Sequence, residues 1–104
     1  MKMCKMECII DHHKLEEVME ALTNIGISGL TISEVREYDS HGGHTEYYRG
    51  VSYRANLKTE MKVEAFIPED QVDKVESVVK AVVQTGEDRG GEITIMPVES
   101  SLHI

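Results

Sequence analysis

The order in which two hydrophobic periodicities follow one another constrains the fold of this chain more than any other feature. Residues 3–10 alternate with period two, which is typical of a strand with one buried face. The side chains expected on that buried face are Cys4, Met6, Cys8 and Ile10. Residues 11–26 instead place apolar side chains three and four positions apart, which predicts an amphipathic helix that Asp11 caps and Gly26 ends.

The same succession of patterns returns in the second half of the chain. Residues 28–38 and 61–68 alternate like strands, residues 69–86 carry a valine stripe with helical spacing, and residues 92–98 form a last strand-like segment. The resulting order, βαββαβ, is that of the ferredoxin-like α+β fold. We therefore expect a single domain over residues 1–104, with four antiparallel strands, both helices on one face of the sheet, and the other face open to self-association.

Composition excludes several functional classes. The chain has 104 residues and a formal net charge of −8, whereas nucleic-acid and anionic-membrane binding require a basic surface. No apolar run approaches the about 18 residues that cross a bilayer, and the N-terminal segment, which contains Glu7, does not resemble a signal peptide. We therefore expect a cytoplasmic protein with reduced cysteines that binds no nucleic acid and does not insert into a membrane. The sequence has no nucleophile–base or P-loop motif, so an enzyme is not expected.

A polar segment separates the second and third expected strands and is far longer than a hairpin turn needs. It contains HGGHTEYYRG at residues 41–50, which combines three glycines with side chains that can form hydrogen bonds. Long connections inside compact domains are usually functional. We therefore interpret this segment as a loop that binds a ligand or a partner.

Three motifs resemble those of the PII signalling proteins. GISGLTISEV is similar to the second strand of that family, GGHTEYYRG followed by VSY is similar to the start of its T-loop, and QTG at residues 84–86 is similar to the end of its second helix. The resemblance runs from about residue 3 to residue 98. It implies a homotrimer that binds an adenine nucleotide between subunits, often with 2-oxoglutarate. It also implies regulation of a membrane transporter or an enzyme through the T-loop, here approximately residues 38–59.

The resemblance assigns a nucleotide site residue by residue. The adenine end corresponds to Ile9, Gly29, Thr31 and Phe66. Gly86, Gly90 and Gly91 correspond to backbone that faces phosphates, and Arg89 adds a cation to the same loop. The complete nucleotide-binding set implied is Ile9, Gly29, Thr31, Arg36, Tyr38, Phe66, Gly86, Glu87, Arg89, Gly90 and Gly91. The implied effector and T-loop set is His41, Gly42, Gly43, His44, Arg49, Tyr53 and Arg54.

Three departures from the family pattern alter the expected ligand. His41 stands where the family has the glutamine that ligates magnesium and contacts 2-oxoglutarate, and Glu60 stands where a lysine pairs with that acid. Glu92 replaces a lysine that contacts phosphates, and each reversed charge repels an anion. The departures favour ADP, AMP or cyclic AMP over ATP with 2-oxoglutarate, with bicarbonate as a candidate second anion. Divergent PII-like proteins tied to carbon transport use such ligands, which points to regulation of nitrogen or carbon metabolism.

The alternative interpretation is a metal-responsive PII-like protein associated with heavy-metal transport. His41 and His44 lie three residues apart, and the cysteines and methionines of the first strand are soft ligands. Core packing of the sulfur side chains, with the loop histidines facing solvent or ligand, is the competing interpretation. His12 and His13 are expected to be exposed at the start of the first helix. Tyr53 matches a tyrosine that is uridylylated in some PII proteins.

Overall fold

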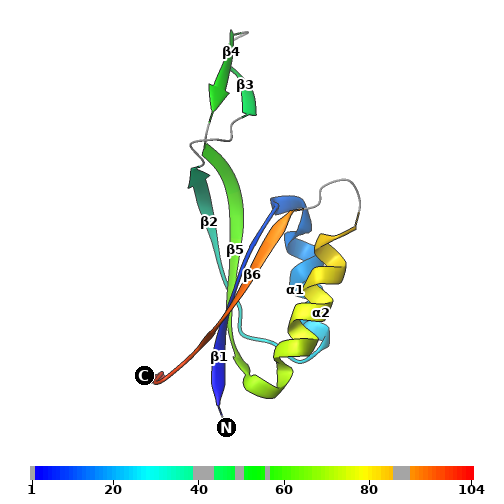
Figure 1. The fold of residues 1–104 in the computed structure, drawn as a ribbon, viewed down its shortest axis with the longest axis vertical. Coiled ribbons are helices and arrows are strands. Elements are labelled where there is room, and N and C mark those ends of the chain that lie inside the picture. Colours follow the sequence, from blue (N-terminus) through cyan, green and yellow to red (C-terminus); the bar gives the residue numbers. More distant parts are fainter. Residues whose placement is uncertain (1, 39–43, 49–50, 56, 86–89) are drawn as a thin grey trace.

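The computed structural model describes residues 2–38, 44–48, 51–55, 57–85 and 90–104, and for 44–48 and 51–55 it describes the backbone only. The main sheet has four strands in the order β2-β5-β1-β6, and every neighbouring pair is antiparallel (Figure 1). These strands are β1 (Met3–Ile10), β2 (Thr31–Tyr38), β5 (Leu57–Pro68) and β6 (Gly91–Pro97). The predicted ferredoxin-like arrangement is confirmed.

Both helices cover the same face of this sheet (Figure 1). Each begins with a 3-10 turn, so that α1 (Leu15–Asn24) follows η1 (His12–Lys14) and α2 (Val72–Val83) follows η2 (Glu69–Gln71). The predicted cap at Asp11 therefore acts on the 3-10 turn, where the Asp11 carboxylate accepts a hydrogen bond from the His13 backbone N–H at 2.9 Å.

Helix α1 ends at a Schellman motif around Gly26. Gly26 has a φ of 94°, a left-handed conformation that glycine adopts without a Cβ clash. Its N–H donates to the Thr23 carbonyl at 3.0 Å, and the Ile27 N–H donates to the Leu22 carbonyl at 3.0 Å. This confirms the predicted end of the first helix, while the corresponding prediction at Gly86 lies outside the described residues.

The core lies between the helices and one face of β1. Burial alternates along this strand, and Met6, Cys8 and Ile10 have no exposed surface. The buried helix residues that close the core are Val18, Leu22, Val75 and Val79. Burying one such side chain contributes about 1.5–3 kcal/mol, and burial raises the pKa of the Cys8 thiol to about 11, which opposes the thiolate that a soft metal binds. The core-packing interpretation of the sulfur side chains is confirmed.

The face of the sheet that no helix covers is charged at its centre. Lys5 Nζ lies 2.7 Å from Glu64 Oε2, and Lys62 Nζ lies 3.2 Å from Glu7 Oε1. Both pairs join β1 to β5, which are neighbours in the sheet. Phe66 on the same face is 51% exposed, which is unusual for a large aromatic side chain and marks a surface suited to contact with another molecule.

The connection between β2 and β5 contains a hairpin that was not predicted. Strands β3 (His44–Tyr48) and β4 (Val51–Ala55) pair antiparallel, and the expectation of an irregular connection was wrong for these residues. The hairpin extends past the end of the main sheet (Figure 1), and the longest dimension of the molecule is 54 Å.

Two strand boundaries also differ from the predicted ones. β5 begins at Leu57 rather than at residue 61, because its first residues pair with the end of β2, with Tyr38 opposite Leu57. β2 begins at Thr31 rather than at residue 28. In both cases the pairing partner, which the local pattern cannot reveal, sets the boundary.

Candidate functional site

A pocket of about 220 Å³ lies at the end of the sheet where β6 begins. Four strands or their flanking residues contribute to its lining, which consists of Ile9, Glu37, Lys58, Glu60, Gly90, Gly91 and Glu92. The structure thus brings together three members of the predicted nucleotide set, Ile9, Gly90 and Gly91. The charged side chains around them come from β2, β5 and β6.

Negative charge dominates this pocket. Lys58 Nζ lies 2.8 Å from Glu60 Oε1, and the hydrogen bond to Glu60 raises the pKa of the Lys58 ammonium. Glu60 is buried, with 6% of its surface exposed, so this ion pair is partly shielded from water. Glu37 and Glu92 line the same pocket, so its described lining contains three carboxylates and one ammonium. Sequence reasoning missed Lys58, although its position two residues before Glu60 on a strand places both side chains on one face.

Gly91 allows α2 and β6 to approach each other closely. A Cβ at this position would lie 2.7 Å from Cγ1 of Val83, near the end of α2. By contrast, a Cβ at Gly90 would meet no atom within 4 Å, so Gly90 is open to a ligand. Gly90, Gly91 and Glu92 also line a larger pocket of about 470 Å³, whose other walls include Val79 and Lys80 of α2.

Lys14, at the start of the first helix, forms hydrogen bonds with Thr85, the residue that precedes the predicted phosphate loop. Its Nζ donates to the Thr85 carbonyl oxygen at 2.8 Å and to Thr85 Oγ1 at 2.7 Å. Thr85 Oγ1 in turn donates to the Val82 carbonyl at 2.7 Å, which adds a link to α2. Sequence reasoning did not identify Lys14, because the two partners are 71 residues apart.

Of the predicted adenine end, Ile9 lines the pocket with Gly90 and Gly91, but Gly29, Thr31 and Phe66 do not. Thr31 begins β2, which is one edge strand, whereas β6 is the opposite edge strand. Phe66 on the neighbouring strand β5 is half exposed, and a Cβ at Gly29 would meet no atom within 4 Å. A single chain therefore does not bring Gly29 and Thr31 together with Gly90 and Gly91.

The remaining predicted residues form three groups. Arg36 and Tyr38 lie on β2 and are exposed. His44 lies on β3, and Tyr53 and Arg54 lie on β4, where only the backbone is described. The predicted residues outside the described part of the chain are His41, Gly42, Gly43, Arg49, Gly86, Glu87 and Arg89.

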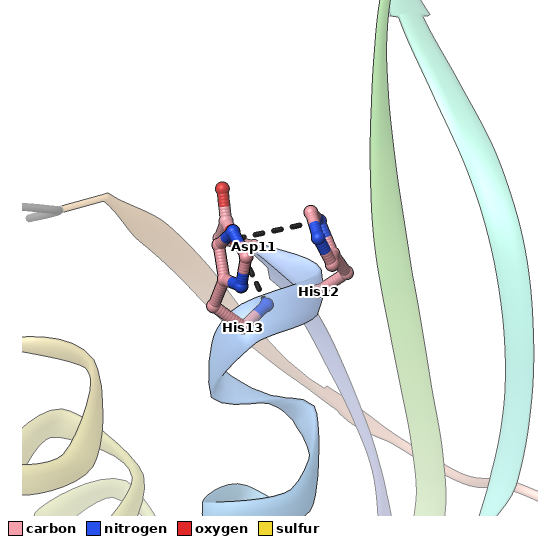
Figure 2. A group of neighbouring side chains, drawn as sticks. All are labelled: Asp11, His12 and His13. Carbon is pink, nitrogen blue, oxygen red and sulfur yellow. Dashed lines mark hydrogen bonds and ion pairs between the residues drawn. The ribbon is translucent and has the colours of Figure 1, made fainter.

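A further cluster lies where β1 meets the first helix. Asp11, His12 and His13 each offer a ligand atom, and these atoms all lie within 4.8 Å of one another. The His12 and His13 ring centroids are 3.9 Å apart, and Asp11 Oδ1 lies 3.6 Å from His12 Nδ1 (Figure 2). The hydrogen bond from the His13 N–H lowers the pKa of the Asp11 carboxyl. Both histidines are exposed, as the sequence predicted.

Within the described ranges, no helix is long and apolar enough to cross a membrane.

Comparison with known proteins places the chain in a family. The family described as Nitrogen regulatory protein P-II matches residues 3–104. A Nitrogen regulatory protein P-II from Nostoc punctiforme is 44% identical over 102 residues, which cover 98% of this chain and 91% of that protein. The protein of the same name from Haemophilus influenzae is 39% identical, with the same coverage of both chains.

Solved structures agree with this assignment. The Bacillus subtilis GlnK structure superposes with a TM-score of 0.73 at 24% identity, covers 95% of this chain and 87% of its own, and shows the shared fold. The structure of Arabidopsis thaliana PII bound to citrate gives a TM-score of 0.71 at 29% identity, with 93% of this chain and 78% of that chain covered. The sequence motifs, the ferredoxin-like sheet and these matches agree, and the chain belongs to the P-II family of regulatory signal-transduction proteins.

Proposed function

We propose that this chain forms a cytoplasmic homotrimer that binds an adenine nucleotide between its subunits and signals the bound state to a target. The whole chain, residues 1–104, acts as one domain, and the T-loop at about residues 38–59 contacts the target. That target is a membrane transporter or an enzyme of nitrogen or carbon metabolism. Family membership supports the signalling role, and the arrangement of the predicted site supports the shared binding site.

The separation of the predicted site into two halves is the observation that carries this proposal. Gly29 and Thr31 lie beside the β2 edge, and Gly90 and Gly91 lie at the β6 edge. Gly29 and Thr31 do not line the pocket that contains Gly90 and Gly91, whereas the β2 edge of one copy can meet the β6 edge of the next. Repeating that contact around a threefold axis closes a ring, as is common for homo-oligomers. The uncovered sheet face with its half-exposed Phe66 supports such an assembly.

The charges at the β6 end favour a nucleotide with few phosphates. Glu37, Glu60 and Glu92 line the pocket there together with Lys58. Two like charges 4 Å apart repel by about 1 kcal/mol in water and by about 4 kcal/mol at an effective dielectric constant of 20. ATP brings more negative charge to this pocket than ADP, AMP or cyclic AMP does. The latter three are therefore the preferred ligands, with bicarbonate as a small second anion.

The β3–β4 hairpin supports a role of the T-loop in contacting a target. It is an independent two-stranded sheet that projects beyond the main one (Figure 1). An isolated two-stranded hairpin is at most marginally stable in water. A ligand or a partner can therefore shift its population by making contacts that exist in only one of its conformations. Modification of Tyr53 would act on the same element.

Calorimetry with ATP, ADP, AMP and cyclic AMP, each with and without bicarbonate or 2-oxoglutarate, tests the proposal. We expect ADP, AMP or cyclic AMP to bind more tightly than ATP, and 2-oxoglutarate to leave ATP binding unchanged. Sedimentation of the same samples should give three chains per particle. Absence of binding by all four nucleotides at millimolar concentration would refute the nucleotide part of the proposal.

A charge-matched pair of variants tests the pocket itself. Glu92→Lys removes a lining carboxylate, and we expect it to strengthen ATP binding about tenfold, equivalent to about 1.4 kcal/mol. Glu99→Lys makes the same change of net charge at an exposed position beyond β6. If both variants shift ATP affinity equally, long-range charge rather than the pocket determines the preference.

A further inference from the structure

We infer that Asp11, His12 and His13 form a binding site for a borderline divalent transition-metal ion such as Zn²⁺. The site lies on the turn between β1 and α1 and does not use the loop histidines His41 and His44 as ligands. Its existence does not depend on nucleotide binding.

The donor set determines the class of ion. Two imidazoles and one carboxylate match Zn²⁺, Cu²⁺ and Ni²⁺, whereas Mg²⁺ and Ca²⁺ prefer oxygen ligands throughout. Three protein ligands leave at least one coordination position for water or for a group from another molecule. The set therefore predicts selectivity for Zn²⁺ over Mg²⁺.

The geometry is close to that of a metal site. With bonds of about 2.1 Å, neighbouring ligand atoms of a tetrahedral zinc site lie about 3.4 Å apart. Asp11 Oδ1 and His12 Nδ1 are 3.6 Å apart, and no pair of candidate ligand atoms in the cluster is separated by more than 4.8 Å. Because both histidines are exposed, rotation of their side chains closes this difference without moving the core.

The convergence of the two histidines is the less expected part of the arrangement. Consecutive residues of a 3-10 turn project about 120° apart, since the turn has three residues per revolution. Here the two rings instead lie with centroids 3.9 Å apart and tilted by 38°, on the outer side of the turn (Figure 2). Two imidazoles and the carboxylate therefore reach one small region that faces solvent.

A backbone hydrogen bond orients the carboxylate. The His13 N–H donates to Asp11 Oδ1 at 2.9 Å, which fixes the Asp11 side chain over the turn. Hydrogen bonds of this kind, made to a metal ligand by a neighbouring group, orient the ligand before the ion arrives.

The charges around Asp11, His12 and His13 determine whether a metal cation is stable at the start of the first helix. The positive end of the helix dipole opposes a cation there by about 0.3–1 kcal/mol. Glu37, Glu60 and Glu92 line the nearby pocket, which also contains Ile9, two residues before Asp11. Lys58 interacts electrostatically with Asp11, and Glu60 already holds its ammonium at 2.8 Å. Among the described residues that line the pocket, the carboxylates outnumber the ammonium, which favours an added cation nearby.

Competition between the full-length protein and a fluorescent zinc chelator, in the absence of nucleotide, tests the site. We expect one Zn²⁺ per chain with micromolar affinity or tighter, and no displacement by millimolar Mg²⁺. His12→Gln and His13→Gln should each weaken zinc binding at least tenfold. Asp11→Asn keeps an oxygen that accepts the His13 N–H hydrogen bond but loses the charge, and it should also weaken binding. Nuclear magnetic resonance should show zinc-dependent shifts of the His12 and His13 ring signals.

Two further variants make the result decisive. His103→Gln removes an exposed histidine from the C-terminal segment and should leave zinc affinity unchanged. The double variant His41→Gln/His44→Gln removes the loop histidines. The inference is overturned if zinc does not bind, if the His12 and His13 variants bind it like the unmodified chain, or if only the loop variant loses it.

Discussion

The two faces of strand β1 differ in burial and in charge. On the side that the helices cover, Met6, Cys8 and Ile10 are fully buried and apolar. On the other side, Lys5 and Glu7 are partly exposed and pair with charged residues of β5. Substitutions on the covered side disturb close packing. On the open side, the ion pairs between β1 and β5 are weakened by water and salt. Stability is therefore concentrated on one face, and the other is available for assembly and ligand binding.

The largest expected effect comes from deleting volume on the covered face. Met6→Ala should lower the free energy of unfolding by about 2–5 kcal/mol, because it leaves a cavity in the core. The truncation Ile9→Ala, three residues further along β1 on the face that no helix covers, should cost less. Urea unfolding at one fixed protein concentration measures both, since assembly makes stability concentration-dependent. Equal losses from the two variants would show that the faces do not differ as described.

The contact between α2 and β6 gives a prediction of intermediate size. Gly91→Ala places a Cβ 2.7 Å from Val83 Cγ1 and should destabilise the protein by about 1–3 kcal/mol. Gly90→Ala, one residue earlier, meets no atom within 4 Å and should leave thermal stability nearly unchanged. A similar loss in both variants would argue that backbone conformation, not the close approach to α2, explains the effect.

A smaller effect is expected from the lysine that joins the two helices. Lys14→Met removes both hydrogen bonds to Thr85 but keeps most of the aliphatic chain, and we expect a loss of about 0.5–1.5 kcal/mol. Amide hydrogen exchange at Thr85 and Gln84 should become faster. Lys74→Met, in the first turn of α2, is the control for loss of one exposed positive charge. Unchanged exchange at Thr85 would show that Lys14 does not position the end of this helix.

The smallest effect concerns the open face and its dependence on pH. The hydrogen bond from Lys5 lowers the pKa of the Glu64 carboxyl, and the same bond raises the pKa of the Lys5 ammonium. The Glu64 contribution is present above the unfolded carboxyl pKa of about 4.3 and is lost as the pH falls through the lowered folded value. The Lys5 contribution is present below about pH 10.4 and is lost as the pH rises through the raised folded value.

Thermal melts of Lys5→Met/Glu64→Gln between acidic and alkaline pH test this pair. The double variant should show weaker pH dependence than the unmodified chain at both ends of the range. The difference should shrink in high salt, which screens exposed charges. An identical pH profile would mean that the pair contributes nothing measurable to folding.

The sequence predicted those features that depend on local periodicity. Period-two alternation identified the buried face of β1, and Gly26 marked the end of α1. It did not predict the β3–β4 hairpin, because residues 44–48 lack an apolar alternation and the alternation of Val51, Tyr53 and Ala55 covers only five residues. The early start of β5 was missed for the same reason, since Lys58 and Glu60 resemble loop residues until their pairing with β2 is known.

The candidate site was less predictable than the fold. The resemblance supplied residues on both edges of the sheet, but only the strand order shows that one chain keeps them apart. The Lys14–Thr85 contact and the Lys58–Glu60 pair depend on positions that folding brings together. His12 and His13 are adjacent in the sequence, yet their convergence with Asp11 depends on side-chain directions that spacing in a 3-10 turn would not predict.

The central position of β1 has a consequence for how the protein acquires its structure during synthesis. β1 precedes the other strands in the sequence, yet its two neighbours in the sheet are β5 and β6, which follow all the other strands. Its two hydrogen-bonding edges therefore stay unpaired until β5 and then β6 have been made. Contacts between such distant segments slow folding, and unpaired apolar strands are prone to aggregate in the meantime. Early termination before β6 should therefore yield a chain that needs chaperones rather than a smaller folded unit.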